Sequence, residues 1–268
     1  MSDPFGRYSR YYDLLYQDKD YAAETAYVQS LIERFSDGGR AVLEIGSGTG
    51  KHATLLSAAG FDVTGVERSE EMKAAADRRV QAVTEPASGH IRPALGRIRF
   101  VHGDGRTARL NQSFDCVLSL FHVVSYQTSN SDVRAMFETA AVHLAERGIF
   151  IFDVWYGPAV LRLRPSVKIR RMEDDRTHVL RVAEPDMNVS QNVVEVDYTI
   201  IVTDKASGQV EELQETHRMR YFFEPELHLF AESAGMDVIH CEQWLDGASP
   251  SSETWGVTVV LQKRASRS

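Results

Sequence analysis

The sequence predicts an α/β protein with a doubly wound, Rossmann-like sheet of seven strands, the last antiparallel, and an antiparallel β insertion after strand five. Two observations support this fold class. Short apolar runs alternate with helix-forming segments over 40–155, which is the rhythm of a parallel sheet covered on both faces. Beyond residue 155 the chain becomes β-rich without a long helix, and helix–strand order returns only after residue 222.

The periodicity also gives the order of the elements. We expect an N-terminal helical cap over 1–39, a core over 40–155, the β insertion over 156–222 and a segment over 223–268 that completes the core. The core strands are expected at 41–45, 61–66, 98–102, 114–121 and 149–154, with helices at 51–59, 69–79 and 132–144. The insertion strands are expected at 167–171, 178–183, 193–203 and 211–223, followed by a helix at 225–234 and strands at 236–244 and 255–262.

Composition excludes several classes of protein. The chain has 268 residues, of which 43% are hydrophobic, and no apolar run approaches the roughly 20 residues that span a membrane. Residues 1–10 are polar and lack a secretory signal, and two cysteines, Cys116 and Cys241, cannot form a disulfide framework, so we expect a cytoplasmic protein. A net charge of -8 argues against nucleic-acid binding.

Three alternate glycines, Gly46, Gly48 and Gly50, follow the first expected strand and precede a helix. Dinucleotide-binding loops have the spacing G-x-G-x-x-G, but the third position here is Lys51. A phosphate-binding P-loop has four residues between its glycines, which this loop does not have. The spacing suits a cofactor without a phosphate to bind, because missing side chains let the backbone approach it closely. The alternative is a tight turn that binds no ligand.

Two acidic residues follow the next two strands at the same edge of the predicted sheet. Glu67 ends the second strand, where an acidic side chain of a doubly wound fold accepts hydrogen bonds from ribose hydroxyls. Asp104 follows the third strand, where a carboxylate can accept from the amino group of adenine. The alternatives are a solvated loop residue for Glu67 and a turn cap for Asp104.

Together these motifs resemble the class I S-adenosylmethionine-dependent methyltransferases. The matching segments are 43–50, 66–69, 103–104 and 114–119, within a stretch of about 40–155. The resemblance implies S-adenosylmethionine as cofactor, S-adenosylhomocysteine as product, and binding of the donor by the glycine loop, Glu67 and Asp104. No metal is expected, because the nine histidines do not form a Cys/His cluster or His-x-x-x-His pair.

The N-terminal tyrosines at 11–16 and the β insertion are similar to a bacterial sugar-modifying branch of this family, which includes N-methyltransferases of nucleotide-linked amino sugars and relatives from polysaccharide pathways. In that branch an N-terminal tyrosine folds over the cofactor, and Tyr16 is the first candidate here. Packing of an amphipathic helix is the alternative. The residues expected to contact the cofactor are Tyr16, Glu44, Gly46, Ser47, Gly48, Gly50, His52, Glu67, Arg68, Met72, Gly103, Asp104, Gly105 and Leu120.

Three residues are candidates for acid–base chemistry. His122 follows the fourth strand, next to the expected position of the sulfonium, and a histidine suits a general base near neutral pH. His217 in the insertion is a second candidate. The amino-sugar enzymes have a histidine five residues after the phenylalanine that ends this strand, whereas Tyr126 holds that place here. This departure favours a hydroxyl acceptor over an amine.

Other residues are expected on the acceptor side. Trp155 and Tyr156 follow strand five and can form aromatic walls around a sugar or base, with packing as the alternative. Arg218 and Arg220 alternate along a strand and can pair with a substrate phosphate, although a solvated sheet face is the alternative. Tyr12 is the remaining substrate-binding candidate.

The sequence therefore predicts an enzyme that methylates a hydroxyl of a small phosphorylated or nucleotide-linked sugar. The alternative is N-methylation of a nucleotide-linked amino sugar or another small phosphorylated metabolite, and a third hypothesis is a non-catalytic module that binds S-adenosylmethionine. The expected partner is this small-molecule acceptor, with no nucleic acid and no membrane, and a homodimer stays open. An RNA methyltransferase is disfavoured, because Leu120-Phe121-His122-Val123 stands where an Asn-Pro-Pro-Tyr-like motif would be.

Overall fold

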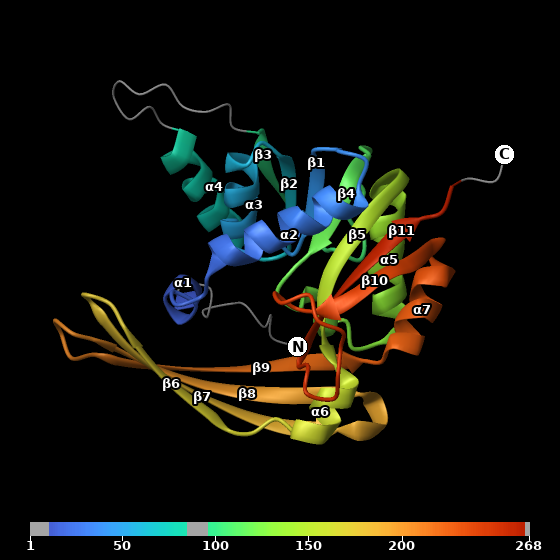
Figure 1. Ribbon diagram of the computed structural model, residues 1–268. Coiled ribbons are helices and arrows are strands. Elements are labelled where there is room, and N and C mark those ends of the chain that lie inside the picture. The colour runs from blue at the N-terminus through green and yellow to red at the C-terminus, as the bar shows by residue number, and fades with distance from the viewer. Residues whose placement is uncertain (1–10, 85–95, 266–268) are drawn as a thin grey trace.

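The computed structural model describes residues 11–84 and 96–265. Figure 1 shows its two parts, an α/β core and a β insertion. Residues 1–10 of the expected N-terminal cap lie outside the described residues. Within the described residues, eleven strands form one sheet: a core at the centre of Figure 1 and an insertion below it. The fold class predicted from the sequence is confirmed.

Seven strands of the described chain form the core of the sheet in the order β3-β2-β1-β4-β5-β11-β10. All of them run parallel except β11, which is antiparallel to both of its neighbours. Their bounds are Ala41–Ile45 for β1, Asp62–Glu67 for β2, Ile98–His102 for β3, Phe114–Ser119 for β4, Leu144–Tyr156 for β5, Met236–Gln243 for β10 and Gly256–Lys263 for β11.

Helices cover both faces of this core. One apolar cluster joins α2, α3 and α4 to one face of β1, β2 and β4, and another joins α5 and α7 to the opposite face. The strand side chains in both clusters have almost no exposed surface, which explains why the strands read as continuous apolar runs. The bounds are Tyr21–Phe35 for α2, Lys51–Ala58 for α3, Glu70–Thr84 for α4, Asn130–His143 for α5 and Glu224–Ser233 for α7.

The insertion is a four-stranded antiparallel sheet in the order β9-β8-β7-β6. It joins the core through two parallel pairs, Trp155 with Tyr221 and Tyr156 with Phe222, at the carboxyl end of β5. The insertion therefore faces the edge of the core at which the glycine loop lies. Its strands are Lys168–Glu173 for β6, Thr177–Asn188 for β7, Val193–Asp204 for β8 and Val210–Phe222 for β9.

A short N-terminal helix, α1 (Tyr12–Leu15), lies between core and insertion (Figure 1). Leu15 packs against the inner face of the insertion, whereas Asp13 contacts the core: its carboxylate accepts from the Thr49 hydroxyl at 2.9 Å and pairs with Arg79 at 2.7 Å. The chain turns after α1, and α2 begins where the Asp20 side chain accepts from the Ala23 amide.

Two elements differ from the sequence prediction. A helix, α6 (Gly157–Leu163), opens the insertion where only strands were expected, with Pro158 in its first turn. In addition, β5 begins at Leu144 rather than at residue 149, directly after α5. No helix in the described residues is long and apolar enough to cross a membrane.

Candidate functional site

A pocket of about 750 Å³ lies between the carboxyl edge of the core strands and the inner face of the insertion. Its walls come from α1, the loops after β1, β2, β3 and β4, the end of β5, the α6–β6 connection and the strands β7 to β9. This volume is in the range of pockets that enclose a small molecule. The topology explains the position, because parallel strands place their following loops at one edge.

The glycine loop forms one wall of the pocket. Gly46 and Gly48 have φ angles of +77° and +54°, a left-handed conformation that glycine adopts without strain. A Cβ atom at Gly46 would lie 2.7 Å from the Val123 side chain, so the absence of a side chain lets the segment after β4 approach the loop. At Gly48 the equivalent space is open. The loop therefore leaves room for a ligand to approach its backbone, which fits the cofactor implied by the motif.

Glu67 lies at the end of β2 and lines the pocket with only 6% of its surface exposed. One carboxylate oxygen accepts from the Gly48 amide and the other from the Ser69 amide, each at 2.8 Å. A carboxylate oxygen can accept more than one hydrogen bond, so these two contacts do not by themselves prevent a contact with a ligand. The side chain thus both fixes the glycine loop and suits the expected contact with ribose hydroxyls.

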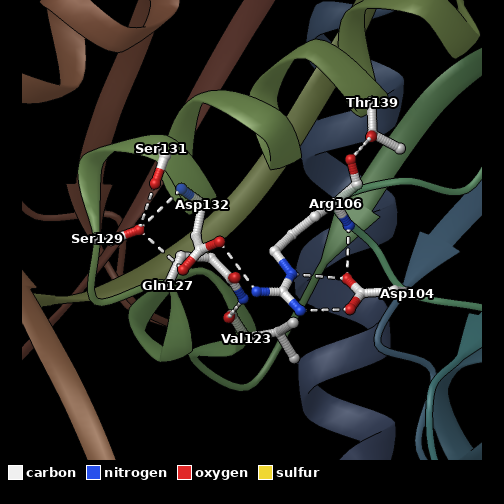
Figure 2. Close-up of polar contacts among 8 residues, drawn as sticks. All are labelled: Asp104, Arg106, Val123, Gln127, Ser129, Ser131, Asp132 and Thr139. Carbon is white, nitrogen blue, oxygen red and sulfur yellow. Dashed lines mark hydrogen bonds and ion pairs between the residues drawn. The ribbon is translucent and has the colours of Figure 1, made fainter.

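Asp104 lies near the same edge and is held by Arg106, as Figure 2 shows. The guanidinium donates to both carboxylate oxygens, at 2.9 and 2.6 Å, and these bonds hold the pKa of Asp104 below its usual value. The same guanidinium donates to Asp132, at the start of α5, at 2.9 Å. A ligand at Asp104 would therefore meet an ion pair, and Arg106 is a pocket residue that the motifs did not indicate.

Other expected cofactor contacts line the same wall of the pocket. They are Arg68, Met72, Gly103, Gly105 and Leu120. Tyr16 and Tyr12 of the N-terminal segment also line it, with ring centroids 4.8 Å apart. Tyr16 packs edge-on against Phe121 at 4.9 Å and accepts from Arg181 at 3.4 Å. The N-terminal segment therefore reaches the place where the core wall and the insertion wall of the pocket meet.

Four expected cofactor contacts do not line the pocket: Glu44, Ser47, Gly50 and His52. Glu44 and His52 lie beneath the loop in a buried polar cluster, where His52 contacts Glu24 at 2.8 Å. Burial, with a smaller contribution from nearby Glu67, raises the pKa of Glu44 to about 8. Gly50 is needed for packing, because a Cβ atom there would lie 2.6 Å from Phe100.

His122 lies in an unusual backbone turn that follows β4. Phe121 and His122 both adopt left-handed φ angles, +64° and +62°, a conformation that costs a non-glycine residue about 1 kcal/mol or more. The His122 amide donates to the buried Asp153 carboxylate at 3.1 Å, and the ring Nδ1 lies 2.6 Å from the same oxygen. The ring lines the pocket. The strained turn thus places an imidazole at the end of β4.

The other two acid–base candidates, Tyr126 and His217, both line the pocket and contact one another. Tyr126, in the 3-10 helix η2 (Val123–Tyr126), lies 2.7 Å from His217 Nδ1, and His217 Nε2 lies 3.1 Å from Glu215. Burial raises the pKa of Tyr126 well above its ordinary value, so its hydroxyl stays protonated near neutral pH. Since this hydroxyl is held by the histidine, we expect Tyr126 to orient an acceptor rather than to remove its proton.

The acceptor wall differs from the sequence prediction. Trp155 lines the pocket and packs on Trp255 at 5.4 Å, but Tyr156 lies outside it and packs on the core. Arg218 is exposed on the outer face and pairs with Glu195 at 3.3 Å. Arg220 is buried between α5 and α7, where it donates to Asn130 and Glu226.

Tyr156, Arg218 and Arg220, which were expected to contact the substrate, therefore lie outside the pocket. The alternation along β9 was predicted correctly, but the arginine face points away from the pocket, whereas His217 and Met219 point toward it. Among the described residues of the α6–β6 connection and the insertion, the cations that line the pocket are Arg164, Lys168 and Arg181. No motif indicated them, because only the folding of the insertion onto the core brings them to the site. The described residues contain no cluster of three or more metal-ligating side chains.

The sequence and structure were compared with known proteins. Residues 42–148 match the methyltransferase domain family. A dTDP-3-amino-3,6-dideoxy-alpha-D-glucopyranose N,N-dimethyltransferase from Streptomyces fradiae is 27% identical, covering 89% of this chain and 87% of the relative. A dTDP-3-amino-3,4,6-trideoxy-alpha-D-glucopyranose N,N-dimethyltransferase from Streptomyces venezuelae is 28% identical, covering 86% and 90%.

The fold matches a solved structure over nearly its whole length. A crystal structure of an S-adenosylmethionine-dependent methyltransferase from Clostridium acetobutylicum superposes with a TM-score of 0.79, covering 96% of this chain and 97% of that one at 18% identity. The likeness extends through the insertion, so the antiparallel sheet belongs to the shared fold.

Proposed function

We propose that the chain is a class I S-adenosylmethionine-dependent methyltransferase that methylates the amino group of a nucleotide-linked amino sugar. Both relatives described above are named as N,N-dimethyltransferases of such sugars and match this chain across its insertion. The hydroxyl acceptor expected from the sequence has no counterpart in these names. The amine is therefore the better-supported acceptor.

The observation that carries this proposal is the two-sided pocket. On one side the glycine loop and the Glu67 carboxylate suit a nucleoside-containing methyl donor. On the other, Trp155 and Trp255 provide flat apolar walls, and the exposed Arg164 and Lys168 lie at the α6–β6 connection. Aromatic walls suit a sugar or base, and cations suit a diphosphate, so this side fits a nucleotide-linked acceptor.

Bound S-adenosylmethionine supplies a methyl group on a sulfonium, which becomes a neutral thioether when the acceptor attacks. The protein's main contributions are to align the acceptor and to remove its proton. A sugar amine carries an extra proton near neutral pH, and its nitrogen lone pair becomes available only after that proton leaves. We assign proton removal to His122, which lines the pocket at the junction of its two sides.

Tyr126 is assigned a different role in the same step. Its hydroxyl is oriented by His217, and its oxygen can accept a hydrogen bond from the acceptor's amino group. Glu67 and the Asp104–Arg106 pair would hold the donor's ribose and adenine. Tyr16 is assigned to the cover over the donor because it lines the pocket from α1.

The proposal is tested by turnover on matched acceptors. Purified protein and S-adenosylmethionine are incubated with a dTDP-linked amino sugar and with the same nucleotide sugar bearing a hydroxyl in place of the amine, and products are identified by mass spectrometry. We expect methylation of the amine only. Turnover of the hydroxyl sugar alone, or of neither, would refute the proposed acceptor.

A further inference from the structure

Asp153 is a buried carboxylate that the proposed chemistry has not yet used. It lies in β5 with 1% of its surface exposed. One oxygen, Oδ2, contacts the His122 amide at 3.1 Å and the His122 ring at 2.6 Å. The other, Oδ1, is buried without a hydrogen-bond partner among the described residues. Burying a carboxylate with one oxygen unsatisfied disfavours folding, so stability alone does not explain this residue.

The position of Asp153 relative to His122 suggests what the charge does. The ring Nδ1 is within ion-pair distance of Oδ2, but their alignment does not satisfy the geometry of a hydrogen bond. The well-formed hydrogen bond is instead the one from the His122 amide, which supports the left-handed turn. The carboxylate therefore acts on the backbone through a hydrogen bond and on the ring mainly through its charge.

We propose that Asp153 is a positioning residue for His122. Asp153 holds the strained turn in place, and it stabilises the positive charge that the imidazole acquires when it takes a proton from the acceptor. This inference rests on the proposed function, in which His122 removes the acceptor's proton. The proton moves from the acceptor's ammonium group to His122 Nε2, and the nitrogen lone pair that is set free forms the bond to the methyl group as the bond from methyl to sulfur breaks.

Within residues 11–84 and 96–265, Asp153 is the carboxylate that pairs with this ring. The ring's other neighbours are Phe121 and Trp155, with centroids at 5.8 and 6.3 Å. The Lys19 ammonium lies 4.3 Å from the centroid of the Phe121 ring and pairs with Glu24. A positive charge on His122 would thus have Asp153 as its nearest opposite charge. A buried carboxylate is effective there, because charges interact more strongly where water is excluded.

The test separates the charge from the turn. The substitution Asp153→Asn removes the charge but keeps an oxygen that can accept from the His122 amide, so the turn should persist. We expect kcat with the amine acceptor to fall roughly ten- to a hundredfold, with little change in KM or in binding of S-adenosylhomocysteine. The matched control is Glu173→Gln, which removes a carboxylate 2.9 Å from His178 at the exposed end of the insertion and should leave kcat unchanged.

A double-mutant cycle shows whether Asp153 acts through His122. In a His122→Gln background, Asp153→Asn should have little further effect on kcat, because the charge that it would stabilise no longer forms. Equal fold losses in the two backgrounds, or a loss confined to KM, would overturn the inference.

A readout without any acceptor keeps this inference distinct from the proposed function. The histidine ring nitrogens are observed by ¹⁵N nuclear magnetic resonance in the wild type and in Asp153→Asn. We expect the chemical shifts of the His122 ring nitrogens to differ between the two proteins, since the negative charge beside Nδ1 is absent in the variant. Unchanged chemical shifts would overturn the role of Asp153 even if amine methylation were observed. Changed chemical shifts with no turnover of amino sugars would instead point to a failure of the proposed acceptor.

Discussion

The two sides of the pocket are built in different ways. The donor side consists of the loops after β1, β2 and β3, each of which directly follows its own strand. The acceptor side consists of η2, the end of β5 and the inner face of β7 to β9, which meet only because β9 pairs with the last two residues of β5. Short sequence motifs can therefore encode the donor side, whereas the acceptor side depends on long-range pairing.

The largest effect is expected where the two sides meet, at His122. The substitution His122→Gln should lower kcat by about a hundredfold or more, the usual contribution of a general base. Binding of S-adenosylhomocysteine, measured by calorimetry, should stay close to that of the wild type. A variant with normal kcat would place the base elsewhere and leave His217 as the next candidate.

The next effect concerns the contact between the glycine loop and η2. Gly46→Ala adds a Cβ atom 2.7 Å from Val123 and places it on a backbone at φ +77°. The left-handed conformation alone costs about 1–2 kcal/mol, so donor affinity should weaken by about tenfold or more. Gly208→Ala is the matched control, because its φ is +70° but nothing lies within 4 Å. Equal loss of donor affinity in both variants would argue against a local role for Gly46.

The cations of the acceptor side provide a smaller effect. Arg164→Gln removes a positive charge that lines the pocket and should raise KM for a nucleotide-linked acceptor by about three- to tenfold, less at high salt. Arg218→Gln is the control, because Arg218 pairs with Glu195 on the outer face. If steady-state kinetics showed the larger change for Arg218, the assignment of the two faces of β9 would be wrong.

Glu44 provides a prediction for the donor side that is independent of activity. Burial raises its pKa in the folded protein from 4.5 to about 8, so folding favours its protonated form. The raised pKa adds to the free energy of unfolding, and this contribution is fully present below pH 4.5. It is lost as pH rises to about 8, with the free energy of unfolding falling by up to about 1.4 kcal/mol per pH unit. Glu44→Gln should remove this dependence, which thermal unfolding across pH 5–8 measures. An identical pH profile in wild type and variant would contradict the raised pKa.

These differences also explain how much could be predicted from sequence. The core strands, the glycine loop and the pocket positions of Glu67 and Asp104 follow from local patterns, because each residue stands at a fixed place after an apolar run. Glu44 was expected to contact the cofactor, but its side chain is buried and does not line the pocket.

The acceptor side was predicted less well because its residues are distant in the chain. Arg218 and Arg220 were placed on one face of β9 correctly, yet only the twist and pairing of the sheet decide which face meets the pocket. Asp153 gave no signal, since it stands inside an apolar run that reads as a buried strand. The helix α6 was missed because it is short and contains Pro158.

The account's central claim is that the methyl group is transferred to nitrogen. The most direct measurement uses S-adenosylmethionine with a ¹³C-labelled methyl group and a nucleotide-linked amino sugar labelled with ¹⁵N. We expect the product's methyl carbon to show one-bond coupling to ¹⁵N in the nuclear magnetic resonance spectrum. A labelled methyl carbon on the sugar without coupling to nitrogen would show transfer to oxygen and contradict the claim.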